Sequence, residues 1–332
     1  MLNNKTILIT GGTGSFGNFF TEYVLTHYHP KKIIIYSRDE FKQFNMRNKF
    51  MAHDDKLRYF IGDVRDKDRL NRAFRGVDYV IHAAAMKQVP ACEYNPHEAI
   101  KTNIDGAVNI IDAALDTGVK KVVALSTDKA VNPSNLYGGT KLVSDKLFVS
   151  ANAYSGAEGT VFSIVRYGNV AGSRGSVIPF FAQMIADGKT ELPITDYRMT
   201  RFWIDLKQGV ELVLKALEES KGGETYISKI PSFKITDLAK AMLPTCEMPE
   251  IGIREGEKLH EVMVGKEDSL TTYEYDKHFI IFPHMEWWNK ETHFTQGGVR
   301  VEDGFEYSSG SNKEWLGVQE LKQLLAQNKY VK

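Results

Sequence analysis

Residues 125–141 read Leu-Ser-Thr-Asp-Lys-Ala-Val-Asn-Pro-Ser-Asn-Leu-Tyr-Gly-Gly-Thr-Lys, and the rest of the chain is organised around them. The apolar run Val122–Leu125 at their start is short and β-branched, which predicts a buried strand. If a helix opens at Tyr137, then Tyr137 and Lys141 lie one turn apart on one face of it. The ammonium would then lower the tyrosine pKa from about 10 and provide a base near neutral pH.

Thr127, Asp128 and Lys129 follow the strand directly, at the place where open α/β sheets bind their ligands. Each of these signals also has an ordinary structural explanation. A Tyr-x-x-x-Lys pattern is common on surface helices, and adjacent opposite charges are usually a solvated loop pair. Their joint position favours a catalytic group made of Thr127, Asp128, Lys129, Tyr137 and Lys141.

Composition places the chain among ordinary globular proteins. It has 332 residues, 42% of them hydrophobic and 25% charged, with 42 basic and 42 acidic side chains. This balance gives no indication of nucleic-acid binding, and no apolar run approaches the roughly 20 residues of a membrane span. Cys92 and Cys246 have no metal-ligand spacing, and the nine histidines form no ligand motif, so we expect no metal and a reduced compartment. With no signal peptide visible, we expect a cytoplasmic protein.

A glycine-rich turn follows the first predicted strand, residues 6–10. It reads Gly11-Gly12-Thr13-Gly14-Ser15-Phe16-Gly17, a G-x-x-G-x-x-G spacing that differs from the G-x-G-x-x-G of many dehydrogenases. The mechanics are similar, because glycines allow a tight turn and close backbone approach, and the helix predicted over 18–28 directs its N-terminus at a pyrophosphate. The pattern therefore predicts a dinucleotide site.

The end of the second strand, residues 33–36, bears on the choice between NAD and NADP. A site for NAD usually places an acidic side chain here to bind the ribose 2′-hydroxyl. This chain has Ser37 and Arg38 first, and a guanidinium suits a 2′-phosphate. Lys42 would add a second positive contact, so we favour NADP, although Asp39 could still turn toward the ribose.

Further strands alternate with helices, which predicts a doubly wound parallel sheet of the Rossmann type. Strands are expected at 57–61, 79–82 and 160–165, and crossover helices at 98–117 and 136–155. After the third strand, Asp63 could accept from an adenine amino group or could simply be a turn carboxylate. After the fourth strand, Ala83 to Ala85 would let a cofactor lie against the backbone, with Lys87 at the mouth of the crevice.

The pattern changes after residue 172, so we expect an NADP-binding domain over 1–172 and a smaller α/β substrate domain over 173–332, partly interleaved with the first. Helices are predicted at 180–187, 206–221, 235–243 and 316–326, with short strands near 225–227 and 250–253. Asp205 or a residue near it is expected to cap the second of these helices. We interpret 265–278 as a solvated loop, and Trp287 and Trp288 as packing residues.

The motifs together resemble the extended short-chain dehydrogenase/reductase superfamily, and within it the inverting UDP-N-acetylglucosamine 4,6-dehydratases of pseudaminic acid biosynthesis. The resemblance covers nearly the whole chain and rests on Gly11–Gly17, Tyr36-Ser37-Arg38-Asp39-Glu40, Gly62–Asp66, His82–Ala85, Leu125–Ala130, Arg166–Val170, Gly172–Val177, Met199–Trp203 and Gly256-Glu257-Lys258-Leu259-His260-Glu261.

One departure from the wider superfamily is informative. Retaining dehydratases carry Asp-Glu where this chain has Asp128-Lys129, and their Tyr-x-x-x-Lys lies further downstream. Here Tyr137 stands eight residues after Lys129, as in the inverting enzymes. A related inverting group lacks this tyrosine. Because Tyr137 is present here, the chain resembles the pseudaminic acid branch, and its reaction would be the first step toward a sugar for flagellin or surface glycan modification.

The resemblance implies a hydro-lyase that converts UDP-N-acetylglucosamine to UDP-2-acetamido-2,6-dideoxy-β-L-arabino-hex-4-ulose. Tyr137 takes the 4-hydroxyl proton while hydride passes from C4 to NADP. Lys129 removes the C5 proton, Asp128 protonates the departing 6-hydroxyl, and hydride returns to C6. We therefore expect a lowered pKa for Lys129 and a raised pKa for Asp128.

The same resemblance, together with the patterns above, assigns contacts residue by residue. Substrate contacts are Lys87, Thr127, Asn169, Val170, Arg201, Arg254 and Glu257, with the arginines as natural diphosphate partners. Cofactor contacts are Gly11, Thr13, Gly14, Ser15, Phe16, Gly17, Ser37, Arg38, Asp39, Lys42, Asp63, Val64, Ala83, Lys87, Leu125, Ser126, Tyr137 and Lys141.

Two alternatives remain open at this level. A UDP-sugar 4-epimerase or a retaining 4,6-dehydratase would share the hydride chemistry, although epimerisation needs no base at C5. A non-catalytic NADP-binding sensor would not need Tyr137 and Lys141, which both stand here. The resemblance also suggests a homo-oligomer, but the sequence gives neither the subunit number nor the group that reprotonates C5, and it does not exclude the C4-epimeric substrate.

Overall fold

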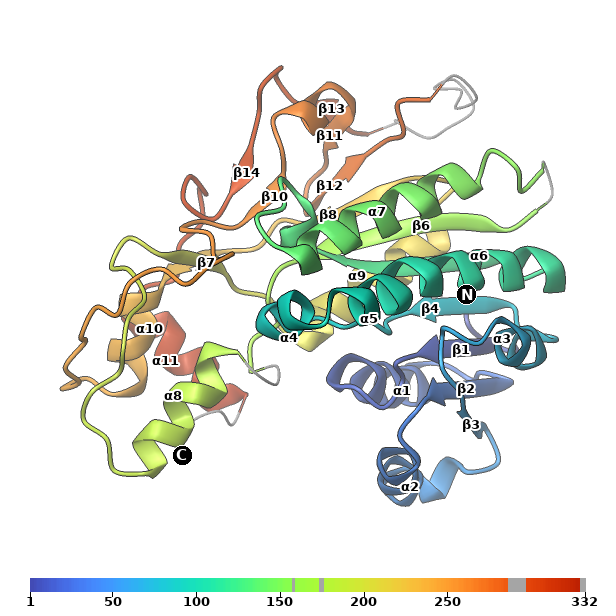
Figure 1. The fold of residues 1–332 in the computed structure, drawn as a ribbon, viewed down its shortest axis with the longest axis horizontal. Helices are drawn as coiled ribbons and strands as arrows, with labels where there is room; N and C mark the ends of the chain where they lie inside the picture. The colour runs from blue at the N-terminus through green and yellow to red at the C-terminus, as the bar shows by residue number, and fades with distance from the viewer. Residues whose placement is uncertain (157–158, 173–175, 286–296, 329–332) are drawn as a thin grey trace.

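A large mixed sheet forms the centre of the molecule (Figure 1), which is described by a computed structural model covering residues 1–156, 159–172, 176–285 and 297–328. Within these residues the strand order is β13-β11-β12-β8-β6-β5-β4-β1-β2-β3. The strands from β3 to β8 in this order are parallel, and β12, β11 and β13 are antiparallel. The predicted doubly wound parallel sheet is therefore confirmed.

The strands follow the apolar runs of the sequence. In the main sheet they are β1 (Thr6–Thr10), β2 (Lys32–Ser37), β3 (Leu57–Ile61), β4 (Tyr79–His82), β5 (Lys121–Thr127), β6 (Val161–Tyr167), β8 (Thr225–Ser228), β11 (Thr272–Glu274), β12 (His278–Ile281) and β13 (Val299–Arg300). Two small antiparallel sheets pair β7 (Thr200–Phe202) with β9 (Ser232–Lys234), and β10 (Val262–Val264) with β14 (Tyr307–Ser308).

Helices cover both faces of the parallel part, so strand residues are buried on both sides. Ile7 and Ile9 of β1 pack in a core with Phe20, which lies in α1, while Leu8 faces the opposite core with Phe74 of α3. The helices here are α1 (Ser15–His27), α2 (Glu40–Lys49), α3 (Lys67–Phe74), α4 (Val89–Tyr94), α5 (Pro96–Ile100), α6 (Gly106–Thr117), α7 (Leu136–Ala151) and α9 (Leu206–Glu219).

Beside the sheet, α8 (Val177–Ala186), α10 (Ile235–Met242) and α11 (Val318–Gln327) form a separate helical group (Figure 1). Their shared core contains Phe181, Leu238 and Leu321. The predicted cap of α9 is confirmed, since the Asp205 carboxylate accepts from Gln208 N at 2.7 Å and the Gln208 side chain bonds back to Asp205 N.

Three local predictions differ from the structure. The helix predicted over 98–117 contains a π-helical turn at Lys101–Asp105. In this turn the Asn103 side chain accepts from Met86 N and donates to Met86 O. The strand predicted near 250–253 is reduced to one bridge at Glu250. The loop predicted over 265–278 instead contains a 3-10 turn, Glu267–Thr271, and β11, because Ser269 and Thr272 are fully buried.

The remaining 3-10 turns are Met51–His53 and Asp128–Ala130. In the part of the chain that the structure describes, no helix combines the length and the hydropathy needed to cross a bilayer. Cys92 and Cys246 are free thiols. Trp287 and Trp288 lie outside the described residues.

Gly17 is required by the contact between α1 and the glycine-rich turn. A Cβ at this position would lie 2.2 Å from Gly12 O, a backbone atom that cannot move aside alone. We expect Gly17→Ala to lower the free energy of unfolding by about 1–3 kcal/mol, the usual cost of overpacking a core. Thermal and urea unfolding measure this change.

Gly209 provides the matched control for this substitution. It is buried in α9, yet apart from its two neighbours in the chain and the nearby helix backbone, no atom of the described residues lies within 4 Å of an added Cβ. Gly209→Ala should stabilise the protein by up to about 1 kcal/mol through helix propensity. Equal stability changes of the same sign in the two variants would contradict the packing explanation.

Candidate active site

A cleft of about 1330 Å³ opens where the carboxyl ends of the central strands meet. It is lined by the turn after β1, the ends of β2 and β5, the segments after β3, β4 and β6, and parts of α8, β7 and residues 254–261. The cleft brings together Gly11, Thr13, Gly14, Ser15, Phe16, Ser37, Arg38, Asp39, Lys42, Asp63, Val64, Ala83, Lys87, Leu125, Ser126, Thr127, Lys129, Tyr137, Lys141, Asn169, Val170, Arg201, Arg254 and Glu257.

Two predicted residues do not line the cleft. Gly17 is buried against Gly12 and supports the turn from behind. Asp128 is fully buried behind Lys129, with an exposed fraction of 0%. Direct contact between Asp128 and a molecule in the cleft therefore needs a side-chain rearrangement or a path through its neighbours.

The glycine-rich turn leaves the N-terminus of α1 open. Gly11 has φ +64°, and a Cβ there would come within 2.9 Å of Ala84 N. Gly14 is the N-cap of α1 and supplies no side-chain cap, and the first turn of the helix contains no acidic residue. Free N–H groups and the helix dipole therefore favour an anion at this point of the cleft.

Charged side chains at the end of β2 are arranged around α2. Asp39 is the N-cap of α2, with its carboxylate accepting from Lys42 N at 2.9 Å and pairing with Lys42 Nζ at 3.0 Å. Arg38 is largely exposed and lies 3.8 Å from the Asp63 carboxylate, which also accepts three hydrogen bonds from Arg65, two from the guanidinium and one from the backbone N–H. The carboxylate of Asp39 thus already has a structural role, whereas the guanidinium of Arg38 is accessible from the cleft.

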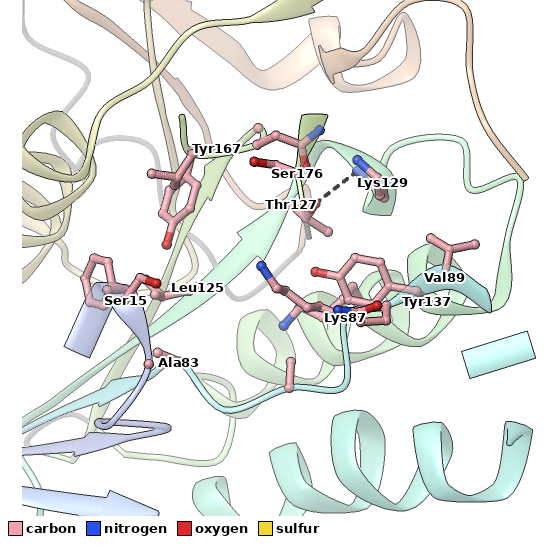
Figure 2. A pocket seen from close by; sticks show the side chains of 18 of the residues that line it. Ser15, Ala83, Lys87, Val89, Leu125, Thr127, Lys129, Tyr137, Tyr167 and Ser176 are labelled. Carbon is pink, nitrogen blue, oxygen red and sulfur yellow. Dashed lines mark hydrogen bonds between the residues drawn. The ribbon is translucent and has the colours of Figure 1, made fainter. Parts of the chain in front are cut away.

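Lys129 and Tyr137 are brought together by a close contact between two chain segments. Tyr137 lies in the first turn of α7, as predicted, and a Cβ on the next residue, Gly138, would lie 2.1 Å from Lys129 O. Thr127 Oγ1 accepts from Lys129 N at 3.4 Å and donates to Asp128 Oδ1 at 2.8 Å. Figure 2 shows Thr127, Lys129 and Tyr137 around one part of the cleft.

A buried ion cluster joins this region to the C-terminal half of the chain. Lys129 Nζ lies 3.2 Å from Asp128 Oδ2 and 3.3 Å from Glu261 Oε1. Glu261 Oε1 also lies 3.2 Å from Arg201 Nε. Each carboxylate is almost inaccessible to water, so the two cations provide the compensation that burial requires.

This cluster reverses the expected pKa shifts of Lys129 and Asp128. Burial acts to lower the pKa of Lys129, but the Asp128 and Glu261 carboxylates outweigh it and raise the pKa. Burial acts to raise the pKa of Asp128, but the Lys129 ammonium and hydrogen bonds from its neighbours lower it. The predictions of a lowered pKa for Lys129 and a raised one for Asp128 are therefore wrong for this arrangement.

The expected effect of Lys141 on Tyr137 is also wrong. Burial raises the pKa of Tyr137 to about 12, opposed by the Lys129 ammonium and by a hydrogen bond with Thr127. Lys141 is buried and interacts instead with the Asp145 carboxylate, one further turn along α7. The cation that assists Tyr137 is therefore Lys129.

Asp145 is a residue that the sequence interpretation missed. Its carboxylate accepts from Ser126 Oγ at 2.6 Å and lies 3.7 Å from the Arg166 guanidinium, all within the core. Arg166 continues to Met263 O at 2.9 Å. A polar residue at i+4 from Lys141 on a helix face that packs on the sheet was the available signal.

Glu261 is the last residue of the motif Gly256–Glu261, and the sequence alone predicts no role for it. It precedes β10 and is held by Ser309, since Glu261 N donates to Ser309 Oγ at 2.9 Å and Ser309 N donates to Glu261 O at 2.8 Å. Burial, followed by the Asp128 carboxylate, raises the pKa of Glu261 to about 7. The available signal was an acidic residue directly before the apolar run Val262–Val264.

The residues expected to bind substrate lie around this cluster. Arg201 is partly buried in β7 and also donates to Thr200 O at 2.7 Å. Arg254 and Asn169 are exposed at the cleft, and Val170 forms a bridge with Ile204. Glu257 Oε2 is buried without a hydrogen-bond partner among the described residues. No group of three or more His, Cys, Asp or Glu side chains in that part of the chain is placed to hold a metal ion.

Comparison with known proteins gives consistent matches along the whole chain. A family model described as "Polysaccharide biosynthesis protein" matches residues 7–283. A Campylobacter jejuni protein named UDP-N-acetylglucosamine 4,6-dehydratase (inverting) is 57% identical over 330 residues, which are 98% of each chain. A Rickettsia akari protein named UDP-glucose 4-epimerase is 42% identical, over 100% of this chain and 98% of its own. The solved structure of Pen from Bacillus thuringiensis has 38% identity and a TM-score of 0.90, covering 100% of both chains.

The raised pKa of Glu261 predicts a specific dependence of stability on pH. Its proton is bound more tightly in the folded than in the unfolded chain, so this contribution is complete below about pH 4.5 and is lost as the pH rises through about 7. Glu261→Gln lacks the titration. Its stability relative to the wild type should therefore rise across this range by up to about 3 kcal/mol, from about 2.5 pH units at 1.36 kcal/mol each.

Urea unfolding of both proteins at a series of pH values measures this difference. A stability difference that stays constant between about pH 4.5 and 8 would show that Glu261 has its ordinary pKa in the folded protein.

Proposed function

The chain belongs to the polysaccharide biosynthesis protein family and is kin to the inverting UDP-N-acetylglucosamine 4,6-dehydratases, and on this basis we propose that it is an NADP-dependent hydro-lyase with that activity. The product is UDP-2-acetamido-2,6-dideoxy-β-L-arabino-hex-4-ulose. We place this reaction at the first step of pseudaminic acid biosynthesis, in the cytoplasm and in a homo-oligomer.

The observation that carries the proposal is that Lys129, which lines the cleft together with Tyr137, pairs at 3.2 Å with the buried carboxylate of Asp128. A 4,6-dehydratase needs a base for the C5 proton and an acid for the 6-hydroxyl in addition to the groups that serve C4. An amine and a carboxyl in direct contact supply such a pair once the proton of the ion pair is redistributed between them.

The residues around the glycine-rich turn fit a nicotinamide dinucleotide. A side chain at Gly11 would fill the space against Ala83 and Ala84, and the open N-terminus of α1 suits a pyrophosphate. Arg38 and Lys42 suit a ribose 2′-phosphate, and Asp39 is occupied as a helix cap. When bound, the nicotinamide would accept hydride from C4 and return it to C6.

The side chains of the cleft supply the proton chemistry. Tyr137 accepts the proton of the 4-hydroxyl, with Thr127 hydrogen-bonded near the same oxygen and Lys129 favouring the phenolate. A ketone at C4 acidifies the C5 proton, which Lys129 removes as a neutral amine. Asp128 protonates O6 as the C6–O bond breaks and water leaves. Lys141 interacts with the Asp145 carboxylate and supports the floor of the cleft.

The nucleotide part of the substrate would occupy the cleft between the sheet and the C-terminal part. We assign the diphosphate to Arg201 and Arg254, which offer bidentate donors. Lys87, Asn169, Val170 and Glu257 complete the assigned contacts. We propose a cofactor-binding part over 1–172 and a substrate-binding part over 173–332, with β8 and β11–β13 joining the sheet of the first.

A UDP-sugar 4-epimerase is the second candidate, because relatives with that name match the whole chain at 42% identity. Epimerisation needs hydride exchange at C4 and no base at C5. The contact of Lys129 with a buried carboxyl pair has no use in that reaction, which favours the dehydratase.

The test is the product formed from UDP-N-acetylglucosamine in D₂O, followed by NMR. We expect a 4-keto-6-deoxy sugar with deuterium at C5 and inverted C5 configuration. Lys129→Ala should still oxidise C4 and reduce the bound cofactor, although more slowly, because Tyr137 loses the cation that favours its phenolate. Water release should fall much further, by at least about 100-fold, the usual range for a lost general base.

Lys121→Ala serves as the control, because Lys121 lies at the opposite end of β5 and donates to Ser220 O at 2.9 Å. A UDP-N-acetylgalactosamine product without deuterium at C5 would establish the epimerase instead. Wild-type turnover by Lys129→Ala would remove Lys129 from the mechanism.

Arg38 tests the preference for NADP. Arg38→Ala should weaken NADP binding by about tenfold or more, the equivalent of one charge-assisted contact, and leave NAD binding nearly unchanged. Fluorescence titration with both cofactors measures the two affinities. Equal losses for NADP and NAD would contradict the assignment of the guanidinium to the 2′-phosphate.

A further inference from the structure

The protonation states of Lys129 and Asp128 are the reverse of those that elimination requires. The reaction needs a neutral amine at Lys129 and a protonated carboxyl at Asp128, and the buried cluster favours the ammonium and the carboxylate. A proton must therefore move from the amine to a carboxyl before the C5 proton can be taken. This transfer requires a group near Lys129 and Asp128 that favours the protonated carboxyl once the amine is neutral.

Glu261 is placed to do so. It is 3% exposed, and its Oε1 lies 3.3 Å from Lys129 Nζ, the same ammonium that Asp128 Oδ2 contacts at 3.2 Å. Once this ammonium loses its charge, the two carboxyl groups can stay side by side by sharing a proton. Glu261 Oε1 faces Lys129 and Arg201, while Oε2 is buried with no donor among the described residues. Asp128 and Glu261 together therefore have one acceptor, Glu261 Oε2, to which no described residue donates.

The charges of the cluster balance in two different ways. With all four groups ionised, Asp128 and Glu261 carry two negative charges and Lys129 and Arg201 two positive ones. If Lys129 passes its proton to the carboxyl pair, one negative charge remains opposite Arg201. Both states are neutral overall, so the transfer does not place an uncompensated charge in the core.

We propose that Asp128 and Glu261 form a proton-sharing carboxyl pair that stores the proton Lys129 must lose to act as a base, which makes Glu261 a positioning residue for the reaction. This inference rests on the proposed function. Without Glu261, a neutral Lys129 would leave the Asp128 carboxylate with no second carboxylate beside it to force its protonation. With Glu261, two adjacent buried carboxylates cannot both stay ionised once the ammonium charge is gone.

The elimination step balances with this stored proton. The C5–H bond breaks, its proton passes to the Lys129 amine, and its electron pair forms the C5–C6 double bond. The C6–O bond breaks, and the hydroxyl leaves as water with the proton that Asp128 held. The cluster returns to four ionised groups, and no external acid or base is needed.

Other charged groups face the pair and are included in this balance. Lys258, on the same segment as Glu261, donates to Val131 O at 2.5 Å, and its pKa is lowered by burial and raised in part by Glu261 and Asp128. Tyr137 in α7 interacts with Lys129 and Asp128. His260 is bonded to Thr200 Oγ1 at 2.7 Å. In the proposed transfer, Lys258, Tyr137, His260 and Arg201 keep their protonation states, and the number of protons on Asp128 and Glu261 depends on Lys129 alone.

The kinetic test compares Glu261→Gln and Glu261→Asp with the wild type. Reduction of the bound cofactor by UDP-N-acetylglucosamine should stay within about threefold in both variants. C5 deuterium exchange and water release should fall by at least about 100-fold in Glu261→Gln and recover at least about tenfold in Glu261→Asp, because aspartate can share a proton. The acidic limb of the pH profile for water release should move in Glu261→Gln.

Glu224→Gln is the matched control, since Glu224 is buried and accepts from Lys221 N and Gly222 N before the amino end of β8. Wild-type elimination by Glu261→Gln, equal loss of cofactor reduction and elimination, or a Gln variant better than the Asp variant would each overturn the proposal. A wild type that forms no 4-keto sugar would defeat the proposed function instead.

Infrared difference spectroscopy tests the carboxyl pair without any turnover. At about pH 8, Lys129→Met should show the C=O stretch of a protonated, buried carboxyl, shifted by D₂O, because the pair has lost its ammonium. The double variant Lys129→Met with Glu261→Gln should lack this band. The absence of the band from Lys129→Met would overturn the proposal whatever the reaction of the enzyme.

Discussion

The interaction on which the site depends is the compensation of two buried carboxylates by one lysine and one arginine. Asp128 and Glu261 are 0% and 3% exposed, and such groups cannot remain charged without partners. Lys129 is the group that both carboxylates share, and Arg201 pairs with Glu261 alone. Because Lys129 also lines the cleft, a molecule that contacts its ammonium there would act on both carboxylates.

The fold supports this cluster from several directions. Gly138 lets α7 approach the backbone of Lys129, which brings Tyr137 to the same place. Ser309 fixes Glu261 through two hydrogen bonds, and Thr200 Oγ1 lies 2.8 Å from Ser309 Oγ. The small sheets β7–β9 and β10–β14 therefore position two of the four charged groups opposite the end of β5.

A second buried network lies one to two turns further along α7. Lys141, Asp145, Ser126 and Arg166 link the helix to β5 and β6 behind the cleft. The two networks separate the roles of the two lysines. Lys129 contacts Asp128 and Glu261, and Lys141 interacts with Asp145. This separation explains why the cation that influences Tyr137 is not the one suggested by helix spacing.

The sequence by itself determined the parallel sheet, the glycine-rich turn, the start of α7 and most of the residues in the cleft. These features depend on local patterns, such as apolar runs, glycine spacing and helix periodicity, which act over a few residues. The tertiary structure decided the directions in which the pKa values of Lys129, Asp128 and Tyr137 are shifted. It also decided that Glu261 belongs to the site. Glu261 is 132 residues from Lys129 along the chain, and a pKa depends on burial and on neighbours that only folding brings together.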